Sequence, residues 1–177
     1  MTNLRLENKR VLLRAVEPED LEYLYSWEND TDLWLLSNTL TPFSRHTLKK
    51  YIENTKADIF EAKQLRLMIE KTADGETIGA IDLFDFDPFN LHAGIGILIA
   101  DKTNRKKGYA SEALDILIDY CFSRLGLMHL FCNITENNEE SLKLFISKGF
   151  VISGQKKLWI RHEEGWYSEY FLQLLKS

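Results

Sequence analysis

The stretch from Gly94 to Gly126 constrains the fold more than any other part of the chain. It begins with an apolar run, 94–100, which predicts a strand buried on both faces. A short loop ends at Gly108, and a helix with apolar residues at intervals of three and four follows over 109–125. N–H groups at a helix start lack partners in the helix and lie at the positive end of its dipole. This order of elements therefore predicts a phosphate-binding site.

The loop between this strand and this helix is basic, although the chain as a whole has a formal net charge of -5. It contains one anion, Asp101, and four cations: Lys102, Arg105, Lys106 and Lys107. Gly108 has no Cβ that would keep a diphosphate away from the backbone. Charge runs in loops are often only solvated surface, but a position directly before a helix favours phosphate binding.

Length and composition predict one domain over 1–177, with 45% apolar and 28% charged residues. The negative net charge argues against nucleic acid and anionic membranes as partners. No apolar run approaches the ~20 residues of a membrane-spanning helix. Cys121 and Cys132 lie in apolar segments, which favours buried free thiols and a cytoplasmic protein. No spacing of cysteine and histidine indicates a metal site.

The rest of the chain alternates between strand and helix patterns. Pro18 opens one helix, Ser44 is suited to cap another, and a loop is expected around Trp34. Turns are expected over 73–76 and 85–90. Helices between strands, together with hairpins, predict an α/β (α+β) fold with a mixed sheet and helices on both faces. The predicted strands are 11–14, 65–70, 77–83, 93–100, 128–134, 150–160 and 166–174. Further helices follow Gly108 and a capping asparagine, either Asn137 or Asn138.

The loop and several distant motifs resemble one enzyme family. Residues 105–110 fit the (Gln/Arg)-x-x-Gly-x-(Gly/Ala) signature of the GCN5-related N-acetyltransferases (GNAT), and Asn138 and 148–150 follow at the family's spacing. The segments 10–14 and 165–169 are similar to the RimJ/RimL and spermidine acetyltransferase branch. The resemblance covers nearly the whole chain, which makes it more specific than the loop signature.

This resemblance implies a mostly antiparallel sheet in which the strands 93–100 and 128–134 splay apart. Acetyl-CoA would enter that gap as if it were an added strand. The implied reaction is transfer of an acetyl group to a primary amine by direct attack in a ternary complex. The acceptor is left open between a polyamine or other small amine and a protein N-terminus.

The resemblance also implies which residues bind acetyl-CoA. Asn138 would reach the pantetheine or its thioester end, and Lys143 is a candidate for the 3′-phosphate together with the lysines of the loop. The main chain of Ile97, Leu98 and Ile99 would pair with the pantetheine amides. Backbone N–H groups would hold the pyrophosphate in a continuous series: Arg105, Lys106, Lys107, Gly108, Tyr109, Ala110 and Ser111.

Two positions depart from the family pattern. Phe145 stands where many relatives carry a tyrosine that protonates the departing thiolate, and Gly94 stands where many carry a glutamate that draws a proton from the amine. The catalytic candidates that remain are Asn138, Ser141, His92 and Asp82. Further possible bases are Asp85 and Asp87, and further possible proton donors are Tyr109 and Tyr167. Each has a simpler interpretation, such as a helix cap for Asn138 or a solvated sheet edge for the aspartates.

The same departures favour an alternative from another class, a CoA-binding sensor or assembly module with little or no turnover. A nucleotide-binding α/β protein is a poorer interpretation, because neither a Walker A nor a dinucleotide glycine motif is present. The expected partners are acetyl-CoA or CoA and an amine, and the analogy adds a homodimer or higher homo-oligomer formed through sheet edges.

Overall fold

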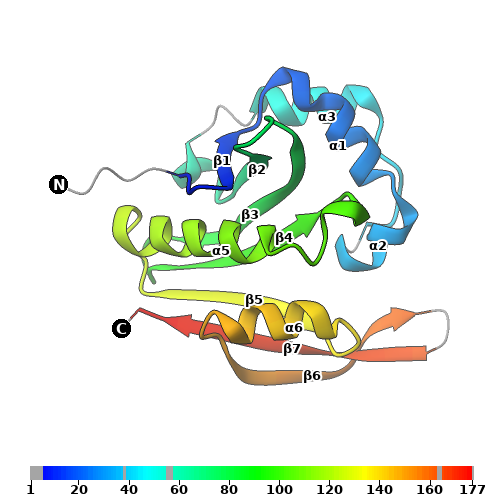
Figure 1. The fold of residues 1–177 in the computed structure, drawn as a ribbon. Coiled ribbons are helices and arrows are strands. Elements are labelled where there is room, and N and C mark those ends of the chain that lie inside the picture. Colours follow the sequence, from blue (N-terminus) through cyan, green and yellow to red (C-terminus); the bar gives the residue numbers. More distant parts are fainter. Residues whose placement is uncertain (1–5, 38, 55–57, 163–164, 177) are drawn as a thin grey trace.

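The computed structural model describes residues 6–37, 39–54, 58–162 and 165–176. Seven strands form one sheet in the order β1-β2-β3-β4-β5-β7-β6 (Figure 1). All neighbours in this sheet are antiparallel except β4 and β5, which are parallel. This confirms the predicted mixed, mostly antiparallel sheet. The strands are β1 Val11–Ala15, β2 Leu65–Lys71, β3 Thr77–Asp87, β4 His92–Ile99, β5 His129–Thr135, β6 Val151–His162 and β7 Gly165–Leu175.

Helices cover both faces of the sheet, as predicted. On β2, Leu67 and Ile69 pack in the core beneath α5, whereas Met68 between them packs with residues of α1 and α3. This alternation follows from the period of two in a strand. The helices are α1 Leu21–Glu28, α2 Thr31–Ser37, α3 Arg45–Asn54, α4 Ile59–Ala62, α5 Tyr109–Asp119 and α6 Glu139–Ser147, with 3-10 turns at Pro18–Asp20 and Lys102–Asn104 and a π-helical turn at Tyr120–Arg124.

Two local predictions are wrong. The loop expected around Trp34 is the helix α2, which begins after Asp30 because the Asp30 side chain accepts the N–H of Asp32 at 3.0 Å. The turn expected over 85–90 is shorter, because β3 continues to Asp87 through a bulge at which Asp85 has a φ of 48°. The expected turn after β6 includes 163–164, which lie outside the described residues.

The central pair of strands separates after a short contact. β4 and β5 pair only through His92–His129, Ala93–Leu130 and Gly94–Phe131 within the described chain. Beyond Gly94 the two strands diverge toward their carboxyl ends (Figure 1). This confirms the predicted splay, and it leaves one edge of the second half of β4 without a neighbouring strand.

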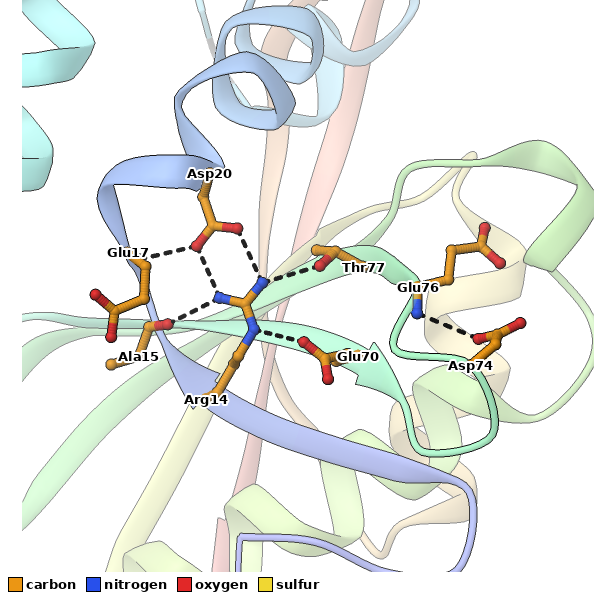
Figure 2. A network of polar contacts seen from close by, with 8 residues as sticks. All are labelled: Arg14, Ala15, Glu17, Asp20, Glu70, Asp74, Glu76 and Thr77. Atoms are coloured by element: carbon orange, nitrogen blue, oxygen red, sulfur yellow. Dashed lines mark hydrogen bonds and ion pairs between the residues drawn. The ribbon is translucent and has the colours of Figure 1, made fainter.

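Arg14 of β1 joins four elements through one guanidinium group (Figure 2). Its two terminal nitrogens donate to the buried Asp20 carboxylate at 2.7 and 2.9 Å, and its Nε donates to Glu70 of β2 at 2.7 Å. One of the two terminal nitrogens of Arg14 also donates to the Thr77 hydroxyl of β3 at 2.9 Å. Arg14 therefore fixes the start of α1 against three strands.

Candidate active site

A cavity of about 580 Å³ lies between the end of β4, the start of α5 and the start of α6. Its lining comes from the end of β4, the basic loop with the start of α5, and the start of α6. Every residue predicted from the sequence to bind the cofactor lies in this lining except Lys102 and Lys107. The fold thus brings together three segments that are far apart in the sequence.

The start of α5 presents free amides to this cavity. Gly108 is the N-cap with a φ of 89°. Its carbonyl oxygen accepts the N–H of Glu112 at 3.1 Å, which is the first hydrogen bond of the helix. The backbone N–H groups of residues 106–111 donate to no group in the part of the chain that the structure describes. Unpaired amide N–H groups at the start of a helix form an arrangement that binds phosphate.

The side chain of Arg105 does not point to a ligand. Its Nε donates to the Ile99 oxygen at 2.9 Å and one terminal nitrogen donates to the Ala100 oxygen at 3.2 Å. The guanidinium therefore anchors the loop to the end of β4.

The lysines near the cavity mouth form exposed ion pairs. Lys106 pairs with Glu140 of α6 at 2.8 Å, and Lys143 pairs with Glu139 at 3.0 Å. Lys102 pairs with Asp32 at 3.2 Å. Exposed pairs of this kind contribute about 0–1 kcal/mol, so these lysines can turn toward a phosphate at small cost.

A second cavity of about 460 Å³ is lined by residues of both β4 and β5 where these strands diverge, and by residues of α1, β2, β3 and β7. It shares with the first cavity two residues of β4, Ile97 and Leu98, and two residues of the α6 start, Asn138 and Ser141. The two spaces therefore meet at these four residues. A thioester in one and a nucleophile in the other would come into contact there.

The comparisons with known proteins decide the family. Residues 10–151 match the family model of the acetyltransferase (GNAT) domain. The chain belongs to the GNAT acetyltransferases. It is 24% identical over 148 residues to the spermidine N(1)-acetyltransferase of Escherichia coli K12, covering 82% of this chain and 75% of that one. It is 28% identical over 174 residues to the uncharacterized N-acetyltransferase p20 of Bacillus licheniformis, covering 97% and 96%.

Solved structures show the same fold. The spermidine N-acetyltransferase of Vibrio cholerae, solved in complex with CoA and spermine, superimposes with a TM-score of 0.85 over 95% of this chain and 96% of that one, at 21% identity. The predictions of a GNAT fold and of an N-acetyltransferase that uses acetyl-CoA are thus confirmed at the level of the family.

An ionic cluster forms one wall of the second cavity of this GNAT domain. Arg66 of β2 binds both carboxylate oxygens of Asp82 on β3, at 2.7 and 3.0 Å, and donates to Glu28 of α1 at 2.6 Å. Burial of Arg66 opposes its charge, but the two carboxylates outweigh burial and raise the pKa of its guanidinium. Asp82 therefore lines the second cavity, with its carboxylate held by a permanent cation.

Sequence reasoning did not single out Glu28, Arg66 or Glu169. Arg66 and Asp82 are cross-strand partners in the β2–β3 hairpin, so the register of the turn over 73–76 was a signal for that pair. Glu169 of β7 is 8% exposed, lines the second cavity, and accepts from Lys156 at 2.8 Å. It belongs to the C-terminal pattern over 165–169 that carried the family resemblance.

Asn138 and Ser141 occupy the junction of the two cavities. The Oδ1 atom of Asn138 accepts the N–H of Ser141 at 3.2 Å and so caps α6. The Nδ2 group of Asn138 remains as a donor for a ligand. Phe145, one turn after Ser141, also borders the second cavity and packs edge-to-face on Phe150 with ring centroids 5.0 Å apart.

The other candidate residues lie apart from this junction. His92 begins β4 where that strand still pairs with β5, and its Nε2 atom lies 3.8 Å from Asp87. Asp87 accepts the N–H groups of Phe89 and Asn90 at 2.8 Å, and these bonds lower the pKa of its carboxyl group. Neither residue lines either cavity, and the same holds for Asp85 and Tyr167.

Cys121 and Cys132 are free and buried, as predicted. Within the described residues, no group of three or more histidine, cysteine, aspartate or glutamate side chains is arranged to hold a metal ion. No described helix is both long enough and apolar enough to span a membrane.

Proposed function

We propose that this GNAT enzyme transfers the acetyl group of acetyl-CoA to a primary amine of a cationic molecule, by direct attack within a ternary complex. The observation that carries this proposal is the junction of the two cavities at Ile97, Leu98, Asn138 and Ser141. One cavity has the shape and donors for a thioester cofactor. The other has the charge for an amine.

The first cavity supports binding of CoA. The free amides of residues 106–111 would bind the diphosphate, and the open edge of β4 at 97–99 would bind the pantetheine amides as a neighbouring strand would. Asn138, which lines both cavities, would donate its Nδ2 group to the pantetheine or to the thioester oxygen. Lys106, Lys107 and Lys143 remain as candidates for the 3′-phosphate.

The second cavity supports a cationic acceptor. Three carboxylates line it, those of Glu28, Asp82 and Glu169, against one guanidinium among the described lining residues, that of Arg66. Half-enclosed negative charge attracts ammonium groups and raises their local concentration. The proposed substrate is therefore a small molecule or chain terminus with more than one positive charge, of which a polyamine is one example.

In the proposed reaction the neutral amine attacks the thioester carbonyl, a C–N bond forms, the C–S bond breaks, and CoA leaves as a thiolate. The amine nitrogen loses one proton and the thiolate gains one. Ser141 lies at the junction and carries the hydroxyl proposed to protonate the sulfur. Asp82 and Glu169 are the carboxylates in reach of the acceptor space, directly or through water.

In this scheme, orientation of the amine against the thioester contributes most of the rate enhancement. Holding the amine against the thioester lowers the barrier by about 7–11 kcal/mol. Acid–base assistance adds about 10²–10⁴-fold, or roughly 3–5 kcal/mol. The glycine and phenylalanine at positions 94 and 145 therefore leave a slower enzyme rather than an inactive one.

The proposal is tested by incubating the protein with acetyl-CoA and a panel of amines and measuring the CoA thiol that is released. The panel contains di- and polyamines, a neutral monoamine, and peptides with free N-termini, and mass spectrometry locates the acetyl group. We expect turnover that is fastest with polycations. Binding of CoA without thiol release across the whole panel would instead support the alternative, a sensor or assembly module, which the apolar Phe145 and Gly94 positions favour.

A pair of glycine variants shows that the activity belongs to this site. Gly108→Trp places a large side chain beside the proposed diphosphate site, where a Cβ would lie 3.6 Å from the Arg10 guanidinium, whereas Gly126→Trp places one at the other end of the same helical segment. Both glycines have positive φ, 89° and 68°, so both variants carry similar backbone strain. We expect only Gly108→Trp to lose CoA binding, with circular dichroism confirming that both variants fold.

A further inference from the structure

The backbone of Arg10 is held in place by hydrogen bonds, close to the first cavity. It lies directly before β1, its N–H donates to the Asn8 side chain at 2.8 Å, and its carbonyl accepts the N–H of Thr72 at 3.1 Å. These bonds hold the Arg10 backbone at the end of β2. The side chain then crosses to the basic loop, 97 residues further along the chain.

The Arg10 guanidinium contacts three consecutive parts of that loop and of α5. It donates to the Lys107 carbonyl at 2.8 Å and to the Glu112 carboxylate at 2.6 Å. Its central carbon lies 4.7 Å from the centre of the Tyr109 ring. Two charged or polar bonds and one cation–π contact therefore fix the guanidinium against the loop.

The bond to Lys107 determines where the next amide points. A trans peptide is planar, with its C=O and N–H directed to opposite sides. When Arg10 holds the Lys107 carbonyl on its own side, the Gly108 N–H is directed away from Arg10. Gly108 lines the first cavity, whereas Lys107 does not.

We propose that Arg10 is a positioning residue for the cofactor diphosphate. It holds the 107–108 peptide so that the Gly108 amide is presented to the phosphate, without itself lining the cavity. This inference rests on the proposed function, because it concerns the same cofactor site.

Arg10 has a second effect through Glu112. This glutamate lies in the first turn of α5, where a carboxylate lowers the positive potential that a diphosphate would meet. The ion pair with Arg10 offsets that negative charge. Loss of Arg10 would therefore misdirect one amide and also leave an unpaired carboxylate close to the phosphate site.

Two thioesters separate this role from a general structural one. Acetyl-CoA carries the diphosphate, and S-acetylpantetheine has the same reactive end without it. We expect Arg10→Ala to raise the KM for acetyl-CoA about 10- to 100-fold, the range for loss of hydrogen bonds to a charged group. The kcat/KM for S-acetylpantetheine should stay unchanged.

Three further variants sharpen the test. Arg10→Lys keeps the charge but not the fork that reaches two acceptors, so its KM should fall between those of the wild type and Arg10→Ala. Glu112→Gln keeps the bond to Lys107 and should bind acetyl-CoA at least as well as the wild type. Arg45→Ala is the matched control, because Arg45 also pairs with a carboxylate, Glu22, and lies 3.7 Å over a tyrosine ring, Tyr25, at a distance from both cavities.

An equal loss with both thioesters in Arg10→Ala, or no loss with acetyl-CoA, would overturn the proposal. Calorimetry with CoA and with pantetheine gives the same comparison without turnover. If the wild type binds CoA but acetylates no amine, the proposed function fails while the Arg10 test still gives its answer.

Discussion

The ring of Phe84 packs against Gly94, its cross-strand partner on β4, and fills the space that a Cβ at position 94 would occupy. Phe131 on β5 holds the ring there through an edge-to-face contact, with ring centroids 5.6 Å apart. A carboxylate side chain has no room at position 94. The departure from the family pattern that the sequence revealed is therefore built into the packing of two neighbouring strands.

Gly94→Ala should accordingly destabilise the protein by about 1–3 kcal/mol, the usual cost of adding a methyl group to a filled core. The double variant Phe84→Ala/Gly94→Ala should be more stable than the sum of the two single changes predicts, because the contact is removed. Urea denaturation of the four proteins measures both effects. Additive changes would show that Phe84 moves aside without cost.

Asn138 has two functions that two substitutions can separate. Asn138→Ala removes both the helix cap and the Nδ2 donor, and should lower stability by about 1 kcal/mol. Asn138→Asp keeps an oxygen that caps α6 through the Ser141 N–H but replaces the donor by a carboxylate. It should keep wild-type stability and lose about tenfold in kcat/KM for acetyl-CoA. Wild-type kinetics of Asn138→Asp would restrict Asn138 to capping.

Ser141→Ala tests the proposed proton donor. If its hydroxyl protonates the departing sulfur, kcat should fall by about 10²-fold, at the lower end for acid catalysis, while CoA binding is retained. Phe145→Tyr places a phenol one helical turn away, bordering the same cavity, and should restore part of the rate in the Ser141→Ala background. Steady-state kinetics of the two single variants and the double variant give the answer, and an unchanged kcat in Ser141→Ala would exclude this role.

Asp20 should make stability depend on acid pH. Burial opposes ionisation of its carboxyl group, but the hydrogen bonds from Arg14 and from the Glu17 N–H outweigh burial and lower its pKa. Its stabilising contribution is therefore complete above the unfolded-state pKa of roughly 4 and is lost as the pH falls through the lower folded-state value. Thermal unfolding measured between roughly pH 2 and 7 should show that the stability of the wild type declines as the pH falls below about 4. Asp20→Asn should show a smaller decline.

Asp20→Asn should also cost about 2 kcal/mol at neutral pH, because it weakens a buried pair with Arg14. Glu22→Gln is the exposed counterpart, since Glu22 pairs with Arg45 at the surface, and should change stability by less than about 1 kcal/mol. Equal effects of the two substitutions would contradict the structural role of the Arg14 contacts in Figure 2.

The two cysteines should resist alkylation in the folded protein. Burial raises the pKa of the Cys121 and Cys132 thiols to about 12, so neither is a thiolate near neutral pH. A thiol reagent should therefore react slowly until denaturant is added, as followed by mass spectrometry. Fast labelling of Cys132, which borders the second cavity, would show that the cavity opens more widely than this structure does.

The sequence predicted those features that depend on local pattern. The strand, the glycine loop and the helix after Gly108 follow from one apolar run, one positive-φ residue and one 3.6-residue period. A cap of α6 at Asn137 or Asn138 was likewise predicted from side-chain chemistry, and the structure assigns it to Asn138. The short helix α2 was missed because seven residues give too little periodicity to distinguish it from a loop.

The features that sequence reasoning missed depend on contacts between distant segments. Arg66 meets Glu28 only because α1 lies over β2, and Arg10 meets Lys107 only because β1 lies beside α5. From the sequence, the four cations of the basic loop could not be distinguished. In the structure, Arg105 donates to main-chain oxygens, whereas Lys106 forms an exposed ion pair. Such differences between chemically similar residues require the register of the folded chain.

The brief pairing of β4 with β5 makes the sheet two half-sheets joined over a short seam. A cofactor lying along the open edge of β4 would complete the hydrogen bonding that the protein's own strands leave unfinished. Its binding energy then adds directly to the resistance of the fold to heat, by the logarithm of its concentration over its Kd. The metabolite that the enzyme consumes would thus serve as a removable part of its scaffold.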